Sequence, residues 1–374
     1  MKVALFSTDF QFNKVVDPVA SRRAQRDVFV EGQNQVTFGG TYWYRMAMPW
    51  GEVGKHGHEI VVTWQMDNAP DGRLRVLGPD GHTWHDDCDV VVMQRWMHRD
   101  GVERIKRAKA TGQIIINDID DYFWALPKSN VAHKTTDPKT NPDFNRDHYR
   151  ANIAASSAIT CSTQMIADAL GRLGPPVFVC RNAIDIDRWP IHDPGSDGMI
   201  GWVGGIPWRG NDLTQLRGVL GPFLEEHGLP FYHGGDSDDP AYPKAWEQLG
   251  LDTNTTAIAT KPLTSIADYP SLWEPVNLAL VPLEQSSFNY AKSYLKGLEA
   301  CACGIPFIAT PTPEYRLLGA GRLAKTPNQW RAHLDELLDP NIRRMEGAMN
   351  RQRAEELSIG NLWPQWASVL DEVA

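Results

Sequence analysis

Short runs of β-branched and other apolar residues alternate with stretches of helical spacing along the whole chain. In the first half the apolar runs predict strands at 2–7, 59–64, 89–94, 113–118, 158–162 and 177–181. Helices are predicted between them, at about 41–56, 99–111 and 163–173. The segment 125–148 is polar and rich in proline, so we expect a long loop of the kind that often serves as a functional lid. The alternation is typical of an α/β architecture with a parallel sheet.

A second series of the same kind begins at Met199. Its predicted strands are 199–205, 230–235, 256–260, 277–283 and 306–310, and its predicted helices are 212–227, 290–304, 327–338, 340–357 and 361–373. The stretch IDRWPIHDPGSDG, at 186–198, contains two prolines and two glycines and is typical of a linker between the two series.

The two series predict an α/β protein with two doubly wound, Rossmann-like domains. The predicted domains lie at 1–190 and 191–355, and they are followed at 356–374 by a C-terminal helix that packs back on the first domain. A length of 374 residues fits two domains. In doubly wound sheets ligands bind at the carboxyl ends of the strands, so we expect the site in a cleft between the domains.

Composition and charge limit the protein classes that need be considered. An apolar content of 42% and a charged content of 22% are those of an ordinary soluble protein, and no apolar run approaches the ~18 residues of a membrane span. The opening MKVALFSTDF lacks the features of a signal peptide, so we expect a first strand and a cytoplasmic protein. The net charge of −9 disfavours DNA as a partner, although a local basic groove would suffice for it.

The cysteines give no sign of a disulfide framework or a zinc site. There are five of them, at positions 88, 161, 180, 301 and 303, and none has the Cys-x-x-Cys spacing. We therefore expect small buried apolar side chains, and we predict no metal site.

Three charged residues share one stripe of the helix predicted at 290–304. Lys292 and Lys296 stand one turn apart and Glu299 follows three residues later, which places them within roughly 60° of one another. Paired lysines weaken a helix slightly, which favours a function for them. A helix N-terminus attracts phosphate, and an acidic residue can bind the diol of a ribose. The stripe therefore indicates a site for a nucleoside diphosphate, the alternative being a solvated helix face.

Several segments, taken in order, resemble the GT-B glycosyltransferases and in particular the retaining family-four group, including its phage-type members. The stretch KSYLKGLEACACGIPFIATPTPEYR is similar to the C-terminal signature of that group, in which a glutamate holds the donor ribose, and Glu299 matches this glutamate. The stretch FGGTYWYRMAMPWGEVGKHGHEIVVTW resembles the Gly-Gly loop and first helix of the N-terminal domain. There Gly39 and Gly40 would let backbone N–H groups approach phosphate or sugar closely.

The stretch IGWVGGIPWRGNDL resembles the first strand of the second domain in that group. The basic Gly-Arg pair of the loop in that group is Gly204-Gly205 in this chain, so that only Arg209 fits the basic residue that binds phosphate. The wider family carries a second glutamate eight residues before the first, and this chain has Ala291 there. The residues that stand near that position instead are Asn289, Lys292 and Ser293.

An acidic cluster follows the strand predicted at 113–118. Asp118, Asp120 and Asp121 stand close together at its end, where crowded carboxylates are commonly functional. An Asp-x-Asp pair can bind a divalent metal and a diphosphate. The GT-B resemblance instead implies that this strand end faces the sugar, so that Asp120 or Asp121 would orient the acceptor hydroxyl or stabilise the sugar cation. Helix capping and loop hydrogen bonds are the third alternative.

The resemblance implies a GT-B fold, in which 1–190 is the acceptor-side domain and 191–355 is the nucleotide-sugar (donor) domain. It implies an enzyme that moves a sugar from a UDP- or GDP-linked donor to a hydroxyl, with retention of configuration and without a cofactor. Arg209, Lys292, Lys296 and the helix N-terminus would stabilise the leaving diphosphate, so that no metal is needed. The alternatives are a nucleotide-sugar epimerase of GT-B fold, a metal-dependent Asp-x-Asp glycosyltransferase, and a binding module that has lost turnover. The acceptor stays open among a glycan, a lipid-linked glycan, a virion or other protein, and a hydroxymethylated DNA base.

Overall fold

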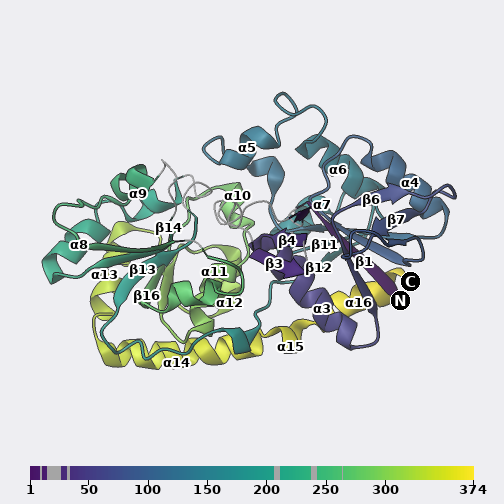
Figure 1. Ribbon diagram of the computed structural model, residues 1–374. Helices are drawn as coiled ribbons and strands as arrows, with labels where there is room; N and C mark the ends of the chain where they lie inside the picture. The colour runs from purple at the N-terminus through teal and green to yellow at the C-terminus, as the bar shows by residue number, and fades with distance from the viewer. Residues whose placement is uncertain (9–10, 15–26, 32–33, 206–210, 237–241, 263) are drawn as a thin grey trace. The chain divides into compact units, whose positions relative to one another are not determined.

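The computed structural model describes residues 1–8, 11–14, 27–31, 34–205, 211–236, 242–262 and 264–374, and these form two compact units (Figure 1). Unit 1 comprises Met1–Leu126, Ala132–Ala183 and Ile359–Ala374. Unit 2 comprises Pro127–Val131 and Ile184–Ser358. Each unit is built around one large parallel sheet.

The sheet of unit 1 has six strands in the order β12-β11-β10-β9-β1-β5, all parallel. The strands are β1 (Lys2–Ser7), β5 (Glu59–Thr63), β9 (Val90–Gln94), β10 (Ile114–Ile119), β11 (Ala158–Cys161) and β12 (Val177–Val179). The central strands β1, β9 and β10 are buried on both faces. Such strands carry continuous apolar runs, which is why the sequence shows them so clearly. Their polar residues Ser7, Gln94 and Asp118 lie toward the carboxyl ends.

Helices cover this sheet. Those of unit 1 are α2 (Gly40–Tyr42), the π-helix η1 (Trp43–Ala47), α3 (Met48–Lys55), α4 (Gly101–Ala110), η2 (Phe123–Ala125), α6 (Arg146–Ala155), α7 (Gln164–Leu170), α15 (Ile359–Leu362) and α16 (Pro364–Val373). The helix α5 (Val131–Thr135) starts at the last residue of the short Pro127–Val131 segment of unit 2 and continues in unit 1. The C-terminal α16 packs against α3, and its Trp366 is completely buried. The core of unit 1 therefore includes side chains from both ends of the described chain.

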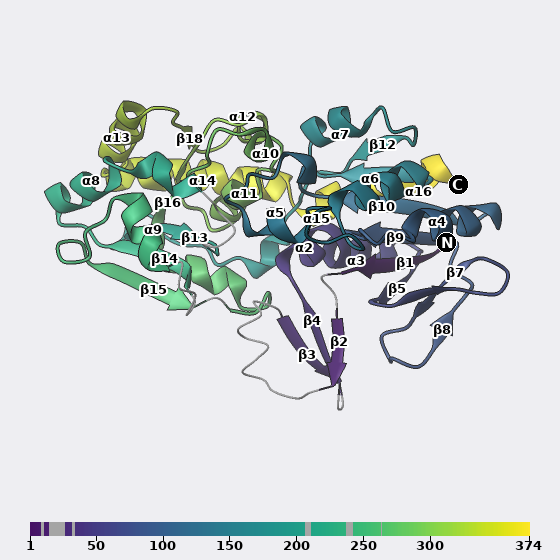
Figure 2. The ribbon, with the colours of Figure 1, turned by 90° about the horizontal axis from the view of Figure 1, so that it is seen from above.

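Two small antiparallel sheets in unit 1 are absent from the sequence prediction. One has the order β2-β4-β3, with β2 (Gln11–Lys14), β3 (Asp27–Glu31) and β4 (Asn34–Phe38); the other has the order β6-β7-β8, with β6 (Met66–Asn68), β7 (Leu74–Leu77) and β8 (Trp84–His85). Figure 2 shows β2, β3 and β4 standing apart from the main sheet of unit 1. These strands are short and lie outside the alternation of strands and helices, so the pattern that predicts the large sheets does not reach them.

The sheet of unit 2 also has six parallel strands, in the order β15-β14-β13-β16-β17-β18. The strands are β13 (Met199–Val203), β14 (Phe231–Asp236), β15 (Ile258–Pro262), β16 (Val276–Val281), β17 (Phe307–Ala309) and β18 (Arg322–Leu323). Its helices are η3 (Ile186–Arg188), η5 (Asp212–Leu216), α8 (Leu220–His227), α9 (Tyr242–Leu249), η6 (Tyr269–Trp273), α10 (Ser287–Tyr290), α11 (Leu295–Ala302), α12 (Pro313–Leu318), α13 (Pro327–Glu336) and α14 (Pro340–Glu356).

The predicted strands of both large sheets are confirmed, with ends that differ by two residues at most. The loop predicted at 125–148 is wrong in part, since it contains α5. The helix predicted at 212–227 is also wrong in part: η5 is a 3-10 helix, and Gly218, with φ +76, separates it from α8. A residue with that backbone conformation interrupts a right-handed helix.

The helix predicted at 290–304 is wrong in its first part. The structure has the short α10, a turn over 291–294, and then α11. Ser286 caps α10, and the side chain of Asn289 donates hydrogen bonds to Asp212 Oδ1 and to the carbonyl oxygen of Glu284. These contacts hold α10 as a separate helix. Lys292 therefore lies in the turn, and only Lys296 and Glu299 share a helix.

All five cysteines are buried, as the sequence predicts. Burial raises the pKa of the Cys161 thiol to about 12, so this thiol stays protonated at neutral pH. Within the described ranges, no helix is long and apolar enough to cross a membrane.

Candidate functional site

Glu299 is a nearly inaccessible carboxylate in the middle of α11. Only 2% of its side chain is exposed. Lys296, one turn earlier, places its ammonium 2.7 Å from Glu299 Oε2, and the phenol of Tyr269 donates a hydrogen bond of 3.0 Å to the same oxygen. A buried carboxylate is costly unless it is paired and hydrogen-bonded, and here it is both. The orientation of the carboxylate is therefore fixed by two neighbours.

Aromatic side chains surround the partner of Glu299. The ammonium of Lys296 lies 5.2 Å from the ring centre of Tyr269 and 5.6 Å from that of Trp273, and it also bonds to the Tyr269 hydroxyl. Trp189 packs edge-on against both rings. Cations are attracted to aromatic faces, so the rings hold Lys296 toward Glu299. Tyr269 comes from η6, far from α11 in the sequence, and no pattern in the sequence indicates that it contacts Glu299.

The turn between α10 and α11 contains two further predicted residues. Lys292 and Ser293 are half-buried there, and the Lys292 ammonium lies 4.8 Å from the ring centre of Phe288. The predicted Asn289 is buried, and the hydrogen bonds of its amide tie α10 to η5 and to the end of β16. Its contacts give it a role in shaping the turn.

Asp212 is the buried anchor of that turn. Besides Asn289, it accepts a hydrogen bond of 2.9 Å from the backbone N–H of Glu284, both on Oδ1, while Oδ2 has no hydrogen-bond partner within the described part of the chain. The sequence shows Asp212 only as one more polar residue at a predicted helix start, so its role could not be recognised there.

The glycine loop predicted to approach phosphate follows β13 directly. Gly204 has φ +151, its N–H donates to the carbonyl oxygen of Gly234, and its own carbonyl accepts from His233 Nε2 at 2.9 Å. A Cβ added at Gly235 would lie 2.9 Å from the Gly204 carbonyl oxygen, so the two backbones approach as only glycine allows. Gly205 follows Gly204 directly, and Arg209 lies outside the described residues.

A stability measurement separates the two lysines. Lys296→Met should lower the free energy of unfolding by about 1–3 kcal/mol, because it leaves the buried Glu299 carboxylate without its charged partner. Lys292→Met should change it by less than about 0.5 kcal/mol, since this residue is in a half-buried turn. Urea denaturation of both variants measures the difference, and equal losses would contradict the pairing described here.

Asp118, the first of the three predicted carboxylates, is a structural residue. It lies inside β10 and is fully buried, and it forms a two-point ion pair with Arg45 of η1: Nη2 to Oδ2 at 2.6 Å and Nε to Oδ1 at 3.1 Å. Thr160 donates a further hydrogen bond to Oδ2. Burial lowers the pKa of Arg45 and Asp118 raises it, with a net upward shift, so the guanidinium stays charged.

This ion pair weakens the metal-binding alternative. An Asp-x-Asp site needs Asp118 and Asp120 to turn carboxylate oxygens toward one ion. Both oxygens of Asp118 instead contact Arg45. Among the residues that the structure describes, no group of three or more histidine, cysteine, aspartate or glutamate side chains could hold a metal ion.

Asp120 and Asp121 lie just beyond the end of β10 and share one arginine. Arg95, directly after β9, donates from Nε and Nη2 to the two carboxylate oxygens of Asp120, at 3.2 and 2.7 Å, and its Nη2 lies 3.6 Å from Asp121 Oδ2. The side chains are partly exposed. The two carboxylates lie close together, as their positions in the sequence indicate. Nothing in the sequence indicates that Arg95 is the arginine that contacts them.

The predicted Gly-Gly loop lies at the start of α2. Gly39 is the N-cap residue, in an extended conformation, and Gly40 is the first helical residue. Thr41 follows, and its hydroxyl accepts a hydrogen bond of 3.1 Å from Arg95 Nη2. The start of α2 and the carboxyl ends of β9 and β10 therefore meet within unit 1.

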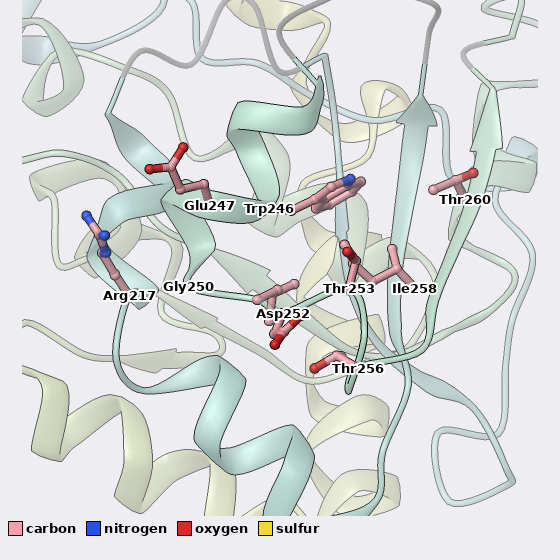
Figure 3. A pocket seen from close by; sticks show the side chains of 10 residues that line it. Arg217, Trp246, Glu247, Gly250, Asp252, Thr253, Thr256, Ile258 and Thr260 are labelled. Atoms are coloured by element: carbon pink, nitrogen blue, oxygen red, sulfur yellow. The ribbon is translucent and has the colours of Figure 1, made fainter.

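Unit 2 also has an open cavity of about 880 Å³ at its edge strand β15 (Figure 3). It is lined by Arg217, Trp246, Glu247, Gly250, Leu251, Asp252, Thr253, Thr256, Ile258 and Thr260. None of these residues is a predicted site residue, and the cavity does not include Glu299. The cavity is therefore not assigned a role in binding or catalysis.

Comparisons with known proteins agree on the fold. No protein-family model matches the chain, and no curated protein matches it in sequence. Among solved structures, a glycosyltransferase from Rickettsia africae has a TM-score of 0.58 and 11% identity, over 100% of this chain and 98% of that one. An alpha-glucosyltransferase in complex with UDP and a 13-mer DNA containing a HMU base has a TM-score of 0.56 and 10% identity, over 100% and 99%.

TarM is a third similar structure, with a TM-score of 0.53 and 12% identity over 80% of this chain. The chain spans 62% of the length of TarM. At such identities a likeness shows the fold. The two six-stranded parallel sheets and these three likenesses together show that the chain has the GT-B fold, built from two Rossmann-like units, as the sequence predicts.

Proposed function

We propose that this protein is a glycosyltransferase that takes a sugar from a nucleotide diphosphate sugar. The observation that carries the proposal is the buried Glu299, held by Lys296 and Tyr269 on the helix that follows β16 of a GT-B fold. A carboxylate that is fixed in this way can accept two hydrogen bonds from the vicinal hydroxyls of a ribose. The alpha-glucosyltransferase of similar fold is bound to UDP, which supports a UDP-linked donor for this chain.

The diphosphate would lie at the turn between α10 and α11. Lys292 supplies a positive charge there, and Ser293 with the first N–H groups of α11 supplies hydrogen-bond donors. Gly204 and Gly205 would approach it from the loop after β13. Arg209, which lies outside the described residues, is proposed as a further phosphate-binding residue because the resemblance implies it. Positive charges and N–H groups fixed around the leaving diphosphate stabilise the charge that develops on it as the glycosidic bond breaks. We assign Lys296 to orienting Glu299 first, because its ammonium already bonds to that carboxylate.

The acceptor hydroxyl would be bound by unit 1, at Asp120 and Asp121, with the start of α2 at Gly39 and Gly40 completing the wall of the site. We propose transfer with retention and without a metal ion, in line with the family-four resemblance. The similar alpha-glucosyltransferase is bound to DNA with a HMU base, which makes a hydroxymethylated base an acceptor worth testing. The net charge of −9 argues against tight binding of DNA in general, so glycan and protein hydroxyls belong in the same panel.

A thermal-shift screen tests the donor. UDP, GDP, UDP-glucose, UDP-N-acetylglucosamine and GDP-mannose are each added to the full chain. One base class should raise the melting temperature, because a ligand that binds only the folded state stabilises it by RT ln(1 + [L]/Kd). ADP and the free sugars serve as controls. A protein that none of the five nucleotides stabilises would contradict the proposal.

Turnover of the donor that the thermal-shift screen selects distinguishes a metal-independent glycosyltransferase from an epimerase, a binding module and a metal-dependent enzyme. Release of the nucleoside diphosphate with excess EDTA should equal release with Mg²⁺ or Mn²⁺, since fixed cations serve the diphosphate. An epimerase would convert the donor sugar without any acceptor, and chromatography of the donor after incubation detects this. A binding module would bind the nucleotide and release nothing, whereas strict dependence on a metal would restore the Asp-x-Asp alternative.

A further inference from the structure

Arg95 has an unusual backbone. Its φ is +56°, and it is the one residue other than glycine with a positive φ in the described part of the chain. For a residue with a Cβ this left-handed conformation is strained, because the Cβ crowds the following carbonyl oxygen. Such residues persist only where the surroundings hold them, and they are concentrated at functional sites. The sequence gives no reason for a turn at Arg95, since no glycine or asparagine stands there.

Contacts from three segments hold the Arg95 side chain. The guanidinium makes the two-point contact with Asp120, at 3.2 and 2.7 Å, donates to the Thr41 hydroxyl at 3.1 Å, and lies 5.6 Å from the ring centre of Phe123. A planar guanidinium fixes a carboxylate in two directions at once, which an ammonium cannot do. The left-handed turn thus directs the side chain of Arg95 across the end of β10.

The exposure of this cluster distinguishes it from the neighbouring ion pair. Arg45 and Asp118 are 1% and 0% exposed and lie in the core. Arg95, Asp120 and Asp121 are 22%, 14% and 29% exposed, so a ligand can reach them. Carboxylate oxygens accept hydrogen bonds, so the two aspartates suit the O–H group of an incoming acceptor.

We infer that Arg95 is a positioning residue for the acceptor side of the reaction: it holds Asp120 and Asp121 so that their carboxylates receive a neutral hydroxyl. This inference rests on the proposed function. It adds one residue to the acceptor side of that site, Arg95, whose guanidinium contacts both carboxylates.

The test uses the full chain, UDP-glucose as donor and glycerol as acceptor. The variant is Arg95→Gly, because glycine tolerates the left-handed backbone. The control is Arg99→Ala, which removes an exposed arginine of the same unit whose partner Asp143 is also exposed. Release of UDP is measured with water alone and with glycerol, and UDP affinity is measured by calorimetric titration.

Arg95→Gly should bind UDP within twofold of the unchanged protein and release UDP at least tenfold more slowly, in water and with glycerol. Added guanidinium ion should restore part of the rate, which a merely structural role would not allow, and Arg99→Ala should behave as the unchanged protein. An unchanged rate for Arg95→Gly would overturn the inference. If the unchanged protein releases a nucleoside diphosphate from none of the UDP- and GDP-linked donors of the thermal-shift screen, the proposed function itself fails.

Discussion

Glu299→Ala is expected to weaken the binding of a nucleoside diphosphate about 100-fold. Two hydrogen bonds from ribose hydroxyls to a carboxylate contribute about 3 kcal/mol together, because each bond to a charged group contributes about 1.5 kcal/mol or more. Calorimetric titration with UDP measures the loss. Glu299→Gln keeps the shape of the side chain and should lose less, since the amide still accepts one hydrogen bond.

A second ligand shows whether the loss concerns the ribose. 2′,3′-Dideoxy-UDP lacks both hydroxyls, so the unchanged protein should bind it much more weakly than UDP. Glu299→Ala should bind the two ligands about equally, because the partner of the hydroxyls is gone. If Glu299→Ala still prefers UDP by the original factor, Glu299 does not contact the ribose. Lys296→Met belongs in the same series, because it removes the ion pair that orients the Glu299 carboxylate.

Arg45→Ala is expected to cost about 3–5 kcal/mol of unfolding free energy, the largest stability effect of a single change considered. The guanidinium and Asp118 are both fully buried, so removing one partner leaves an uncompensated charge in the core. Arg45 also donates to Asn182 Oδ1 at 3.0 Å and to the carbonyl oxygen of Cys180, so the variant loses two further hydrogen bonds. Urea denaturation of the variant measures the loss.

Two comparisons sharpen this measurement. Arg107→Ala removes an exposed partner of Glu103 on α4 and should change stability by less than about 0.5 kcal/mol. The double variant Arg45→Met with Asp118→Leu should lose much less than the sum of the two single losses, because it removes both charges at once. A loss near that of Arg107→Ala for the buried arginine would mean that water reaches the pair in solution.

The parts of the structure that depend on short-range patterns could be predicted from the sequence. Runs such as KVALFS and VVVMQ are buried on both faces of the sheets, and this burial is what makes them continuous and visible. The carboxyl ends of those strands then give the location of the candidate sites. Glu299 could likewise be predicted to lie on a helix, because the segment that contains it follows a buried strand and has helical spacing.

The contacts that give the sites their shape could not be predicted, because they join residues far apart in the chain. Arg45 and Asp118 are 73 positions apart, and Asn289 and Asp212 are 77 apart. The break between α10 and α11 depends on the second of these contacts, so a pattern read from 290–304 alone gives one continuous helix. Tyr269 and Arg95 were missed for the same reason: each is unremarkable in its own segment.

The return of the chain to unit 1 has a consequence for synthesis on the ribosome. Residues 359–374 supply the buried Trp366 and the side chain of Gln365, which accepts a hydrogen bond from the backbone N–H of Arg181, yet they are made after the whole of Ile184–Ser358. Unit 1 is therefore begun before unit 2 but can complete its core only after unit 2 has been made. Until then the surface of α3 that packs against α16 stays open, and a chain that stops before residue 359 offers that surface to chaperones and proteases.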